Sequence, residues 1–237
     1  MAVAANLDTS TSFSAFLKDN KILNELSKGV MTMKAFVYPS VLQKEAIPVL
    51  KKKKKSPNVI IRYSSMSGIK LTVLIPLLNQ LIRDVVSNPT KEDVQYLAIL
   101  CHSGMRCTEM EGFLKELLTF CSDATEVIDL YNGDKVEINH RLKQALSSSK
   151  ATSDDARATV KARCKVLIST PNQFIEVLKS QKKGIECHSL YLDKVDMHCA
   201  LDLTNELVKV SELMDGKPTF KTIMTTQFKG TASADND

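Results

Sequence analysis

The stretch NVIIRYSSMSGIKLTVLIP, from Asn58 to Pro76, decides the fold expected for this chain. It begins with a short apolar run rich in β-branched residues, which is typical of a buried strand. A serine-rich turn containing Gly68 follows, and after it the apolar residues continue in a pattern typical of a buried helix. A strand, a tight turn and a helix in this order predict the first unit of a parallel α/β sheet.

Short apolar runs alternate with helix-period segments along the rest of the chain. This alternation predicts a parallel sheet with helices on both faces. The predicted strands are Val59 to Tyr63, Tyr96 to His102, Glu126 to Tyr131, Lys165 to Thr170, Ser189 to Asp193 and Thr222 to Thr226. The predicted helices are Leu71 to Asn88, Thr108 to Phe120, Gln173 to Ser180 and Leu201 to Met214. Ligands of such sheets bind at the carboxyl ends of the strands, so we expect the functional residues there.

Composition limits the class of protein. The 237 residues suit one α/β domain, and a hydrophobic content of 43% is enough for a core. No apolar run reaches the ~18 to 20 residues of a membrane span, and no signal-peptide core is visible, so we expect no membrane partner. The six cysteines include no CxxC pair, which favours a reducing, intracellular compartment.

Two pairs of residues carry ligand types that zinc accepts, Cys187-His188 and His198-Cys199. The apolar run between them reads as a buried strand. At ~3.3 Å per residue, such a strand holds the two pairs at opposite ends. We therefore expect no metal site.

Several short stretches flank the predicted strands at informative positions. They are Ala35-Phe36-Val37-Tyr38-Pro39-Ser40-Val41-Leu42-Gln43, Ser65-Met66-Ser67-Gly68-Ile69-Lys70, Cys101-His102-Ser103-Gly104-Met105, Tyr131-Asn132-Gly133, Thr170-Pro171-Asn172-Gln173, Asp193-Lys194-Val195-Asp196 and Thr226-Gln227-Phe228. In this order and spacing they resemble the motifs of the first RecA-like domain of DEAD-box RNA helicases. The resemblance covers nearly the whole chain, and its nearest branch is the mRNA-export helicases with a D-E-C-D motif.

The resemblance implies a nucleotide site built on residues 35–43 and on the turn before Lys70. In the family, the positions of Phe36 and Gln43 contact adenine. Pro39 and Ser40 also make sense locally as a helix start, because serine caps helices and proline cannot continue one. Ser67, Gly68 and Lys70 are the residues left over from the family's phosphate loop.

That phosphate loop is degenerate. A working loop needs a lysine on the β/γ-phosphates and a hydroxyl on Mg²⁺. Ungapped matching to the family puts Ile69 at the lysine position and Lys70 at the hydroxyl position. Moving Lys70 into the lysine position needs an inserted residue and leaves Leu71 at the hydroxyl position. Neither register makes a good ATP site, and we expect Met66 and Ile69 to pack inward instead.

The residues for hydrolysis are degenerate as well. By resemblance, Asp193 would orient Mg²⁺, and Lys194 replaces the glutamate that polarises the attacking water. Asp196 is retained, and Thr226 keeps the first hydroxyl of the S-A-T motif while Phe228 replaces the second. These vestigial positions, with the altered phosphate loop, are hard to reconcile with ATP turnover, because each lost charge-stabilising group commonly costs about 10²- to 10³-fold in rate.

Expected RNA contacts come from the same edge and from one basic run. Ser103, Gly133 and Thr170 occupy family RNA-contact positions, whereas Gly104 and Met105 replace a family arginine and glutamate. The five residues Lys51, Lys52, Lys53, Lys54 and Lys55 form a separate polybasic run before the first strand. Such a run binds nucleic acid nonspecifically, acts as a nuclear import signal, or is a solvated loop.

These observations predict a degenerate, ATPase-inactive helicase-like domain that acts as a protein-interaction or RNP-assembly module. We expect that the domain uses no cofactor. We expect it to bind protein partners, with RNA as a further ligand, and to lie in the cytoplasm, including cytoplasmic RNP granules, or in the nucleus. The alternatives are the ATP-binding lobe of a divergent active RNA helicase, using ATP and Mg²⁺, and an RNA-binding protein without ATP use. The expected boundaries are a flexible N-terminus over 1–12, the RecA-like domain over 13–228 with a polar insertion at 147–163, and a flexible tail over 229–237.

Overall fold

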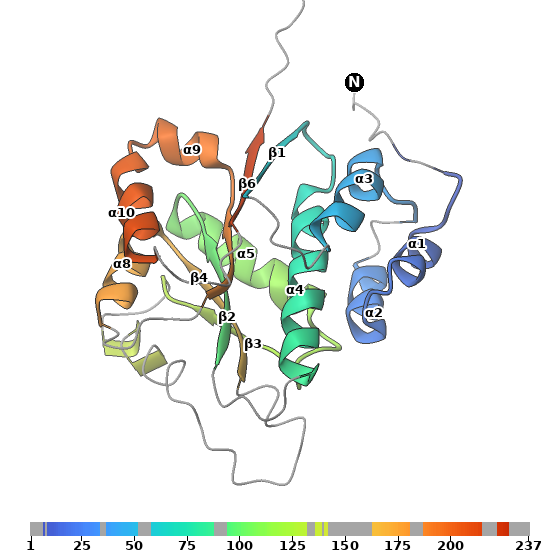
Figure 1. Cartoon of the computed structure of the whole chain (residues 1–237), viewed down its shortest axis with the longest axis horizontal. Helices are drawn as coiled ribbons and strands as arrows, with labels where there is room; N and C mark the ends of the chain where they lie inside the picture. The colour runs from blue at the N-terminus through green and yellow to red at the C-terminus, as the bar shows by residue number, and fades with distance from the viewer. Residues whose placement is uncertain are drawn as a thin grey trace, which may run out of the picture.

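Six strands of the computed structural model form one parallel sheet, in the order β1-β6-β5-β2-β4-β3 (Figure 1). The structure describes Leu7 and residues 9–33, 37–51, 58–87, 94–131, 136–138, 140–141, 163–180, 187–214 and 222–227. The strands are β1 (Val59–Tyr63), β2 (Gln95–Leu100), β3 (Glu126–Asp129), β4 (Cys164–Ser169), β5 (Cys187–Leu192) and β6 (Thr222–Gln227). The predicted α/β class, the RecA-like parallel sheet and all six predicted strands are confirmed.

Helices cover both faces of this sheet, as predicted. Figure 1 shows the N-terminal helices and α4 on one side and α8, α9 and α10 on the other. The helices are α1 (Phe13–Asp19), α2 (Asn24–Thr32), α3 (Val41–Leu50), α4 (Ile69–Ser87), α5 (Gly104–Leu117), α8 (Pro171–Ser180), α9 (Val195–Ala200) and α10 (Thr204–Met214). Among the described residues, none of the helices combines the length and apolarity that a bilayer crossing requires.

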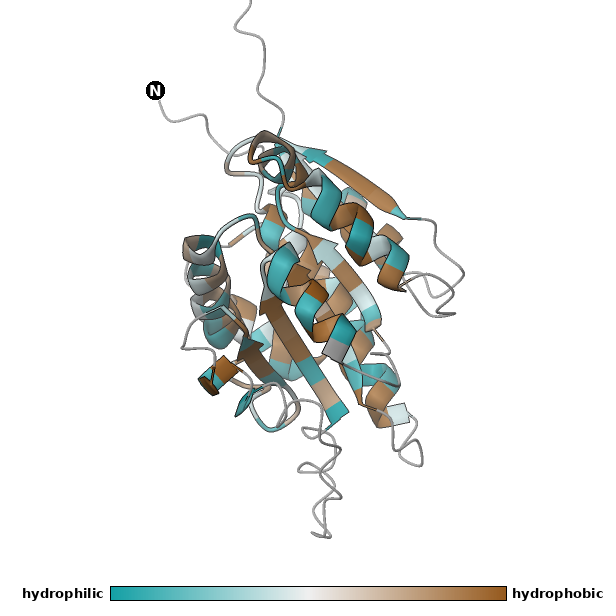
Figure 2. Ribbon diagram, turned by 90° about the vertical axis from the view of Figure 1, so that its left-hand side faces the viewer, coloured by the Kyte–Doolittle hydropathy of each residue, from teal (hydrophilic) through white to brown (hydrophobic). Residues whose placement is uncertain are grey.

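The central strand β2 shows why two separate cores form. Leu97 and Ile99 belong to the core cluster that includes α4 and α5, whereas Ala98 and Leu100 belong to the cluster that includes α8 and α10. Successive side chains of a strand point to opposite faces, so an uninterrupted apolar strand feeds both cores. The brown central strands of Figure 2 show this continuous apolar character.

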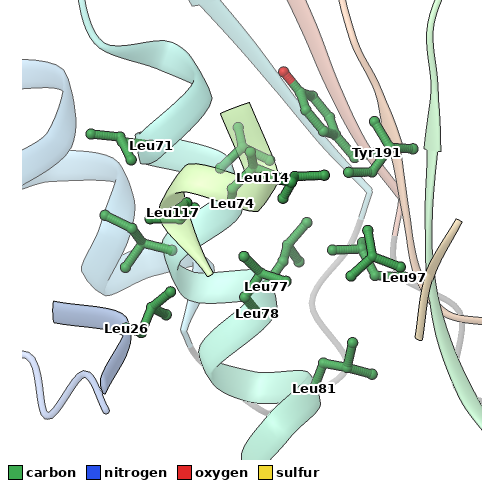
Figure 3. Packing of buried hydrophobic residues seen from close by; sticks show 14 of the residues in the cluster. Leu26, Leu71, Leu74, Leu77, Leu78, Leu81, Leu97, Leu114, Leu117 and Tyr191 are labelled. Atoms are coloured by element: carbon green, nitrogen blue, oxygen red, sulfur yellow. The ribbon is translucent and has the colours of Figure 1, made fainter. Parts of the chain in front are cut away.

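Helix α4 is the main packing element of the first core. Figure 3 shows its leucines Leu74, Leu77 and Leu78 in one buried cluster with the sheet residue Leu97 and the α5 residue Leu114. These leucines are 0 to 2% exposed. A helix that is apolar around most of its surface must be buried, and this burial anchors the turn that precedes α4.

Two local predictions concern helix starts. The predicted helix start at Ser40 is confirmed, because the Ser40 hydroxyl accepts from the Gln43 amide and the Gln43 side chain accepts from the Ser40 amide, forming a capping box. The predicted helix from Leu201 to Met214 is confirmed as α10, which begins three residues later than predicted, at Thr204. The first residues of the predicted range lie in a turn between α9 and α10, where Asp202 has φ 56°. Aspartate tolerates this conformation, so no glycine or proline marks the break in the sequence.

Some predictions fall outside the described residues. These are the roles of Phe36, Gly133, Phe228 and Lys52 to Lys55, nearly all of the insertion at 147–163, and the tail at 229–237. The domain limits therefore stay predictions.

Candidate functional site

The predicted site residues gather at the carboxyl edge of the sheet. The turn of residues 64–68 follows β1, Ser103 follows β2, Thr170 follows β4 and Asp193 follows β5. Because all strands run parallel, these ends lie at one edge. Among the described residues, the fold thus brings together the positions that the sequence singled out, except Lys51, which precedes β1 and lies toward its opposite end.

Gln43 holds the turn of residues 64–68 against α3. Its side-chain amide is 1% exposed, accepts from the Ser40 amide at 2.8 Å and donates to the Gly68 carbonyl at 3.4 Å. The Ser40 hydroxyl donates to the Ser67 carbonyl at 2.7 Å. Gly68 has φ +74°, and a Cβ there would lie 2.5 Å from Gln43 Nε2, so this contact requires glycine. Both ends of the Gln43 amide are engaged within the protein, and adenine recognition by Gln43 stays a prediction.

The two apolar residues of the turn behave differently. Ile69 is 9% exposed and packs in the core, as predicted. The prediction that Met66 packs inward is wrong, because its side chain is 70% exposed. Met66 has φ 62°, a left-handed conformation at the tip of the turn, and its side chain is presented to solvent.

Lys70 lies on the first turn of α4 and points toward α5. Its Nζ lies 4.9 Å from the centroid of the Phe113 ring, a cation–π contact. Burial lowers the pKa of Lys70, and repulsion from Arg106 lowers it further. The ammonium is thus held by an aromatic ring.

Asp193 is the centre of the site and is fully buried. One carboxylate oxygen accepts from Arg106 Nε at 2.6 Å, and the other accepts from the Tyr191 hydroxyl at 2.7 Å. Arg106 also contacts Glu109 at 2.7 Å. Burial alone would lower the pKa of Arg106, but the hydrogen bond and charge of Asp193 raise it overall. The Arg106 guanidinium is therefore the counter-charge of the buried Asp193 carboxylate.

Sequence reasoning missed Arg106, although a signal was present. The buried face of α5 includes Cys107, Met110 and Leu114. Arg106 stands one helical turn before Met110, on that same face. A charged residue on an apolar stripe predicts a buried partner of opposite charge, because burying an unpaired charge is costly.

A second missed residue is Thr225. Its hydroxyl accepts from the Lys194 amide at 3.0 Å and lies 3.4 Å from the Tyr191 hydroxyl. Thr226, the predicted vestige of S-A-T, is half-buried on the other face of β6. The two-residue period of a strand could have identified Thr225, because it places Thr225 on the same buried face as Ile223.

The residues around Lys194 form a tight turn into α9. Lys194 has φ 56° and is the N-cap of α9. Asp196 accepts from the Gln227 amide at 3.2 Å, which ties α9 to β6. The two aspartates thus have different partners, an arginine for Asp193 and a backbone amide for Asp196.

The described RNA candidates serve as local structural contacts. Ser103 is the N-cap of α5 and accepts from the Arg106 amide at 3.4 Å. The Thr170 hydroxyl donates to Gln173 Oε1 at 3.4 Å at the start of α8. Lys51 is half-buried, and its ammonium donates to the Asn20 carbonyl. Burial lowers the pKa of Lys51, with added repulsion from Arg83.

The residues considered for zinc have separate partners. His188 Nε2 lies 3.2 Å from Asp84, whereas the His198 ring meets the His102 ring edge to face at 6.0 Å. Within the described part of the chain, no group of three or more His, Cys, Asp or Glu residues is placed to hold a metal ion.

Two histidines of this edge should make stability depend on pH. Burial lowers the pKa of both His102 and His198, and His198 is fully buried. A depressed folded pKa means that protonation favours the unfolded chain. We therefore expect the free energy of unfolding to fall as the pH drops below about 6.5, the ordinary histidine value. Urea titrations at a series of pH values measure this slope.

Variants of the two histidines test this prediction. The quantity compared between variant and wild type is the slope of the free energy of unfolding against pH, not the free energy itself. His198→Gln should flatten the dependence below about pH 6.5, and the His102→Gln/His198→Gln pair should flatten it further. An unchanged slope in both variants would assign the pH dependence to other groups.

The fold is similar to that of the RecA-like domains of DEAD-box helicases. The DEAD-box helicase Mss116 bound to single-stranded RNA and UDP-BeF superimposes with a TM-score of 0.68 at 16% identity, covering 93% of this chain and 41% of Mss116. The yeast DEAD-box splicing factor Prp28 superimposes with a TM-score of 0.63 at 21% identity, covering 86% of this chain and 44% of Prp28.

The sequence is related to ATP-dependent RNA helicases. DBP9 of Candida albicans is 23% identical over 226 residues, which are 94% of this chain and 34% of DBP9. DBP7 of Mycosarcoma maydis is 23% identical over 207 residues, 84% of this chain and 21% of DBP7. The chain therefore spans about a third or less of these relatives' length. No family model matches it. The predicted resemblance to a DEAD-box RecA-like domain is confirmed, and the narrower mRNA-export branch stays a prediction.

Proposed function

We propose that this DEAD-box helicase-like domain does not turn over ATP and acts as a protein-interaction or RNP-assembly module inside the cell. The absence of ATP turnover is supported by the buried ion pair of Arg106 and Asp193, in which Arg106 Nε lies 2.6 Å from Asp193 Oδ2. The protein-interaction role is supported by apolar side chains exposed at the same edge of the sheet.

The ion pair stands where catalysis would need a metal ion. Phosphoryl transfer depends on cations that neutralise the phosphates and on accurate placement of the attacking water. The resemblance assigns Mg²⁺ to Asp193, whose carboxylate already pairs with a guanidinium. Arginine does not deprotonate in proteins, so a magnesium ion would meet a fixed positive charge. The residues at this edge do not fit Mg-ATP.

Other residues of the edge support the same conclusion. Ile69 fills the family's lysine position with a buried apolar side chain. Lys194 replaces the family's glutamate with a cation, which cannot accept a proton from water. Since losing one preorganised charge-stabilising group commonly costs about 10²- to 10³-fold in rate, these two replacements and the ion pair on Asp193 together leave little activity.

Exposed apolar residues favour a protein partner at this edge. Met105 is 78% exposed and Met66 is 70% exposed. Gly104 stands where the family carries an arginine, and Met105 stands where it carries a glutamate. The missing arginine contact weakens RNA binding by roughly 1.5 to 3 kcal/mol. Methionine is enriched at protein interfaces, and its flexible thioether adapts to partner surfaces.

Mg-ATP and Mg-ADP should leave the thermal unfolding temperature unchanged. A ligand present at about 100 times its Kd stabilises the folded state by about 2.7 kcal/mol, which would shift the midpoint by several degrees. A thermal-shift titration to millimolar nucleotide measures this, and an intact DEAD-box lobe serves as the positive control. A phosphate-release assay with added RNA should stay at background. Micromolar ATP affinity with RNA-stimulated hydrolysis would overturn the proposal.

A second candidate is the ATP-binding lobe of a divergent active helicase. The relatives favour it, because DBP9 is described as an ATP-dependent RNA helicase and matches 94% of this chain. The same titration separates the two candidates, since this one requires nucleotide binding.

A further inference from the structure

Strand β1 lies at one end of the sheet and has a free edge. It pairs with β6 alone, and no other described strand lies on its outer side. Figure 1 shows β1 beside β6, near the top of the view. An edge strand presents unpaired backbone N–H and C=O groups, which form a template for pairing with another chain.

The side chains of β1 divide sharply between core and solvent. Ile61 and Tyr63 are each 7% exposed, whereas Ile60 is 63% exposed and Arg62 is exposed. The pairing register sets Ile60 beside Met224 and Arg62 beside Thr226.

The face that carries Ile60 and Arg62 is therefore a strip of mixed apolar and basic character. Met224 and Thr226, which extend it onto β6, are half-buried. The exposed Met66 follows β1 in the next turn, so the strip leads to the carboxyl edge.

Charge selects the kind of partner that fits this strip. The chain has a net charge of +5, and no described residue forms an ion pair with Arg62. Pairing β1 with β1 of a second copy in a register centred on Arg62 would set two arginines directly opposite each other, which is unfavourable. An added strand of alternating apolar and acidic residues would place its carboxylates on the face of Arg62 and its apolar side chains on the opposite face, beside Ile61 and Tyr63.

We propose that the free edge of β1 binds an extended segment of another protein, of alternating apolar and acidic residues, by adding it as a further strand of the sheet. Main-chain hydrogen bonds provide affinity in such strand addition, and alternate side chains provide specificity. The inference rests on the protein-interaction part of the proposed function and names the partner chemistry. It does not depend on the loss of ATP turnover.

The test uses a blocked synthetic peptide of alternating valine and glutamate and the full chain. We expect NMR amide exchange to slow at Ile60 and Arg62 when the peptide is added. The matched valine and lysine peptide should bind about threefold to tenfold more weakly, because opposite charges pair favourably across strands. In the Arg62→Glu variant the preference should reverse.

Controls separate strand addition from other contacts. The glutamate peptide with N-methylated backbone amides should lose binding, and Val208→Glu, at an exposed site on α10, should leave binding unchanged. The inference would be overturned by equal binding of the glutamate and lysine peptides or by unchanged binding after N-methylation. It would also be overturned by slowed amide exchange at another element, or by slowed exchange in β1 when an RNA oligonucleotide alone is added. Nucleotide titration is read separately, so ATP turnover in a chain that still binds the peptide would contradict only the proposed function.

Discussion

Replacing Arg106 with alanine should lower the free energy of unfolding by roughly 3 to 5 kcal/mol, the usual cost of breaking a buried ion pair from one side. The Asp193 side chain is 1% exposed and that of Arg106 is 11% exposed, so solvent screens this pair poorly. Alanine would leave the Asp193 carboxylate with the Tyr191 hydroxyl and no counter-charge. Urea unfolding monitored by circular dichroism measures the loss.

A double-mutant cycle with Asp193→Asn shows whether the pair itself is responsible. Arg106→Ala in the Asp193→Asn background should cost much less than in the wild type, because asparagine needs no counter-charge. Glu109→Gln provides the contrast, since Glu109 contacts the same guanidinium from a side chain that is 53% exposed. Its cost should stay below about 1 kcal/mol. If Arg106→Ala lowers the free energy of unfolding by less than Glu109→Gln does, Arg106 is not the counter-charge that stabilises Asp193.

Replacing Gly29 with alanine should destabilise the protein by about 3 kcal/mol, at the upper end of typical overpacking costs. A Cβ at Gly29 would lie 1.9 Å from the backbone oxygen of Leu117 and 2.9 Å from its carbonyl carbon. The two helices α2 and α5 would have to separate, because backbone atoms cannot rotate away. The gain in helix propensity, about 1 kcal/mol for glycine to alanine, offsets only part of this cost.

Two other glycines provide matched controls for Gly29. A Cβ at Gly112 on α5 would meet no neighbouring atom within 4 Å, so Gly112→Ala should stabilise the protein by up to about 1 kcal/mol. At Gly104 a Cβ would lie 1.7 Å from the Tyr131 ring, but that side chain is 42% exposed and can swing aside. The expected order of stability in thermal and urea unfolding is Gly112→Ala, then Gly104→Ala, then Gly29→Ala. A Gly29→Ala variant as stable as the wild type would show that α2 and α5 pack less closely.

Local patterns account for what could be predicted. The apolar run of β1 and the helical spacing after Gly68 concern neighbouring residues, and the predicted elements formed there. The helix start at Ser40 was also readable, because its capping partner Gln43 is three positions away. Ile69 packs inward because it opens a helix that is buried on most sides.

Other features depended on contacts between distant parts of the chain. Arg106 and Asp193 are separated by 87 positions, and Lys194 and Thr225 by 31. They meet because the sheet order places β5 between β6 and β2. Residue spacing does not specify which strands become neighbours, so these partners were not predicted.

The sequence by itself determined the α/β class and the strand positions, since both follow from patterns of adjacent residues. Only the tertiary structure decided that Asp193 is neutralised by Arg106, that Met66 faces solvent, and that β1 is the outermost of the described strands. The physical reason is the same in each case. Burial, charge pairing and strand neighbours are properties of the assembled sheet, where residues far apart in sequence compete for the same space and partners.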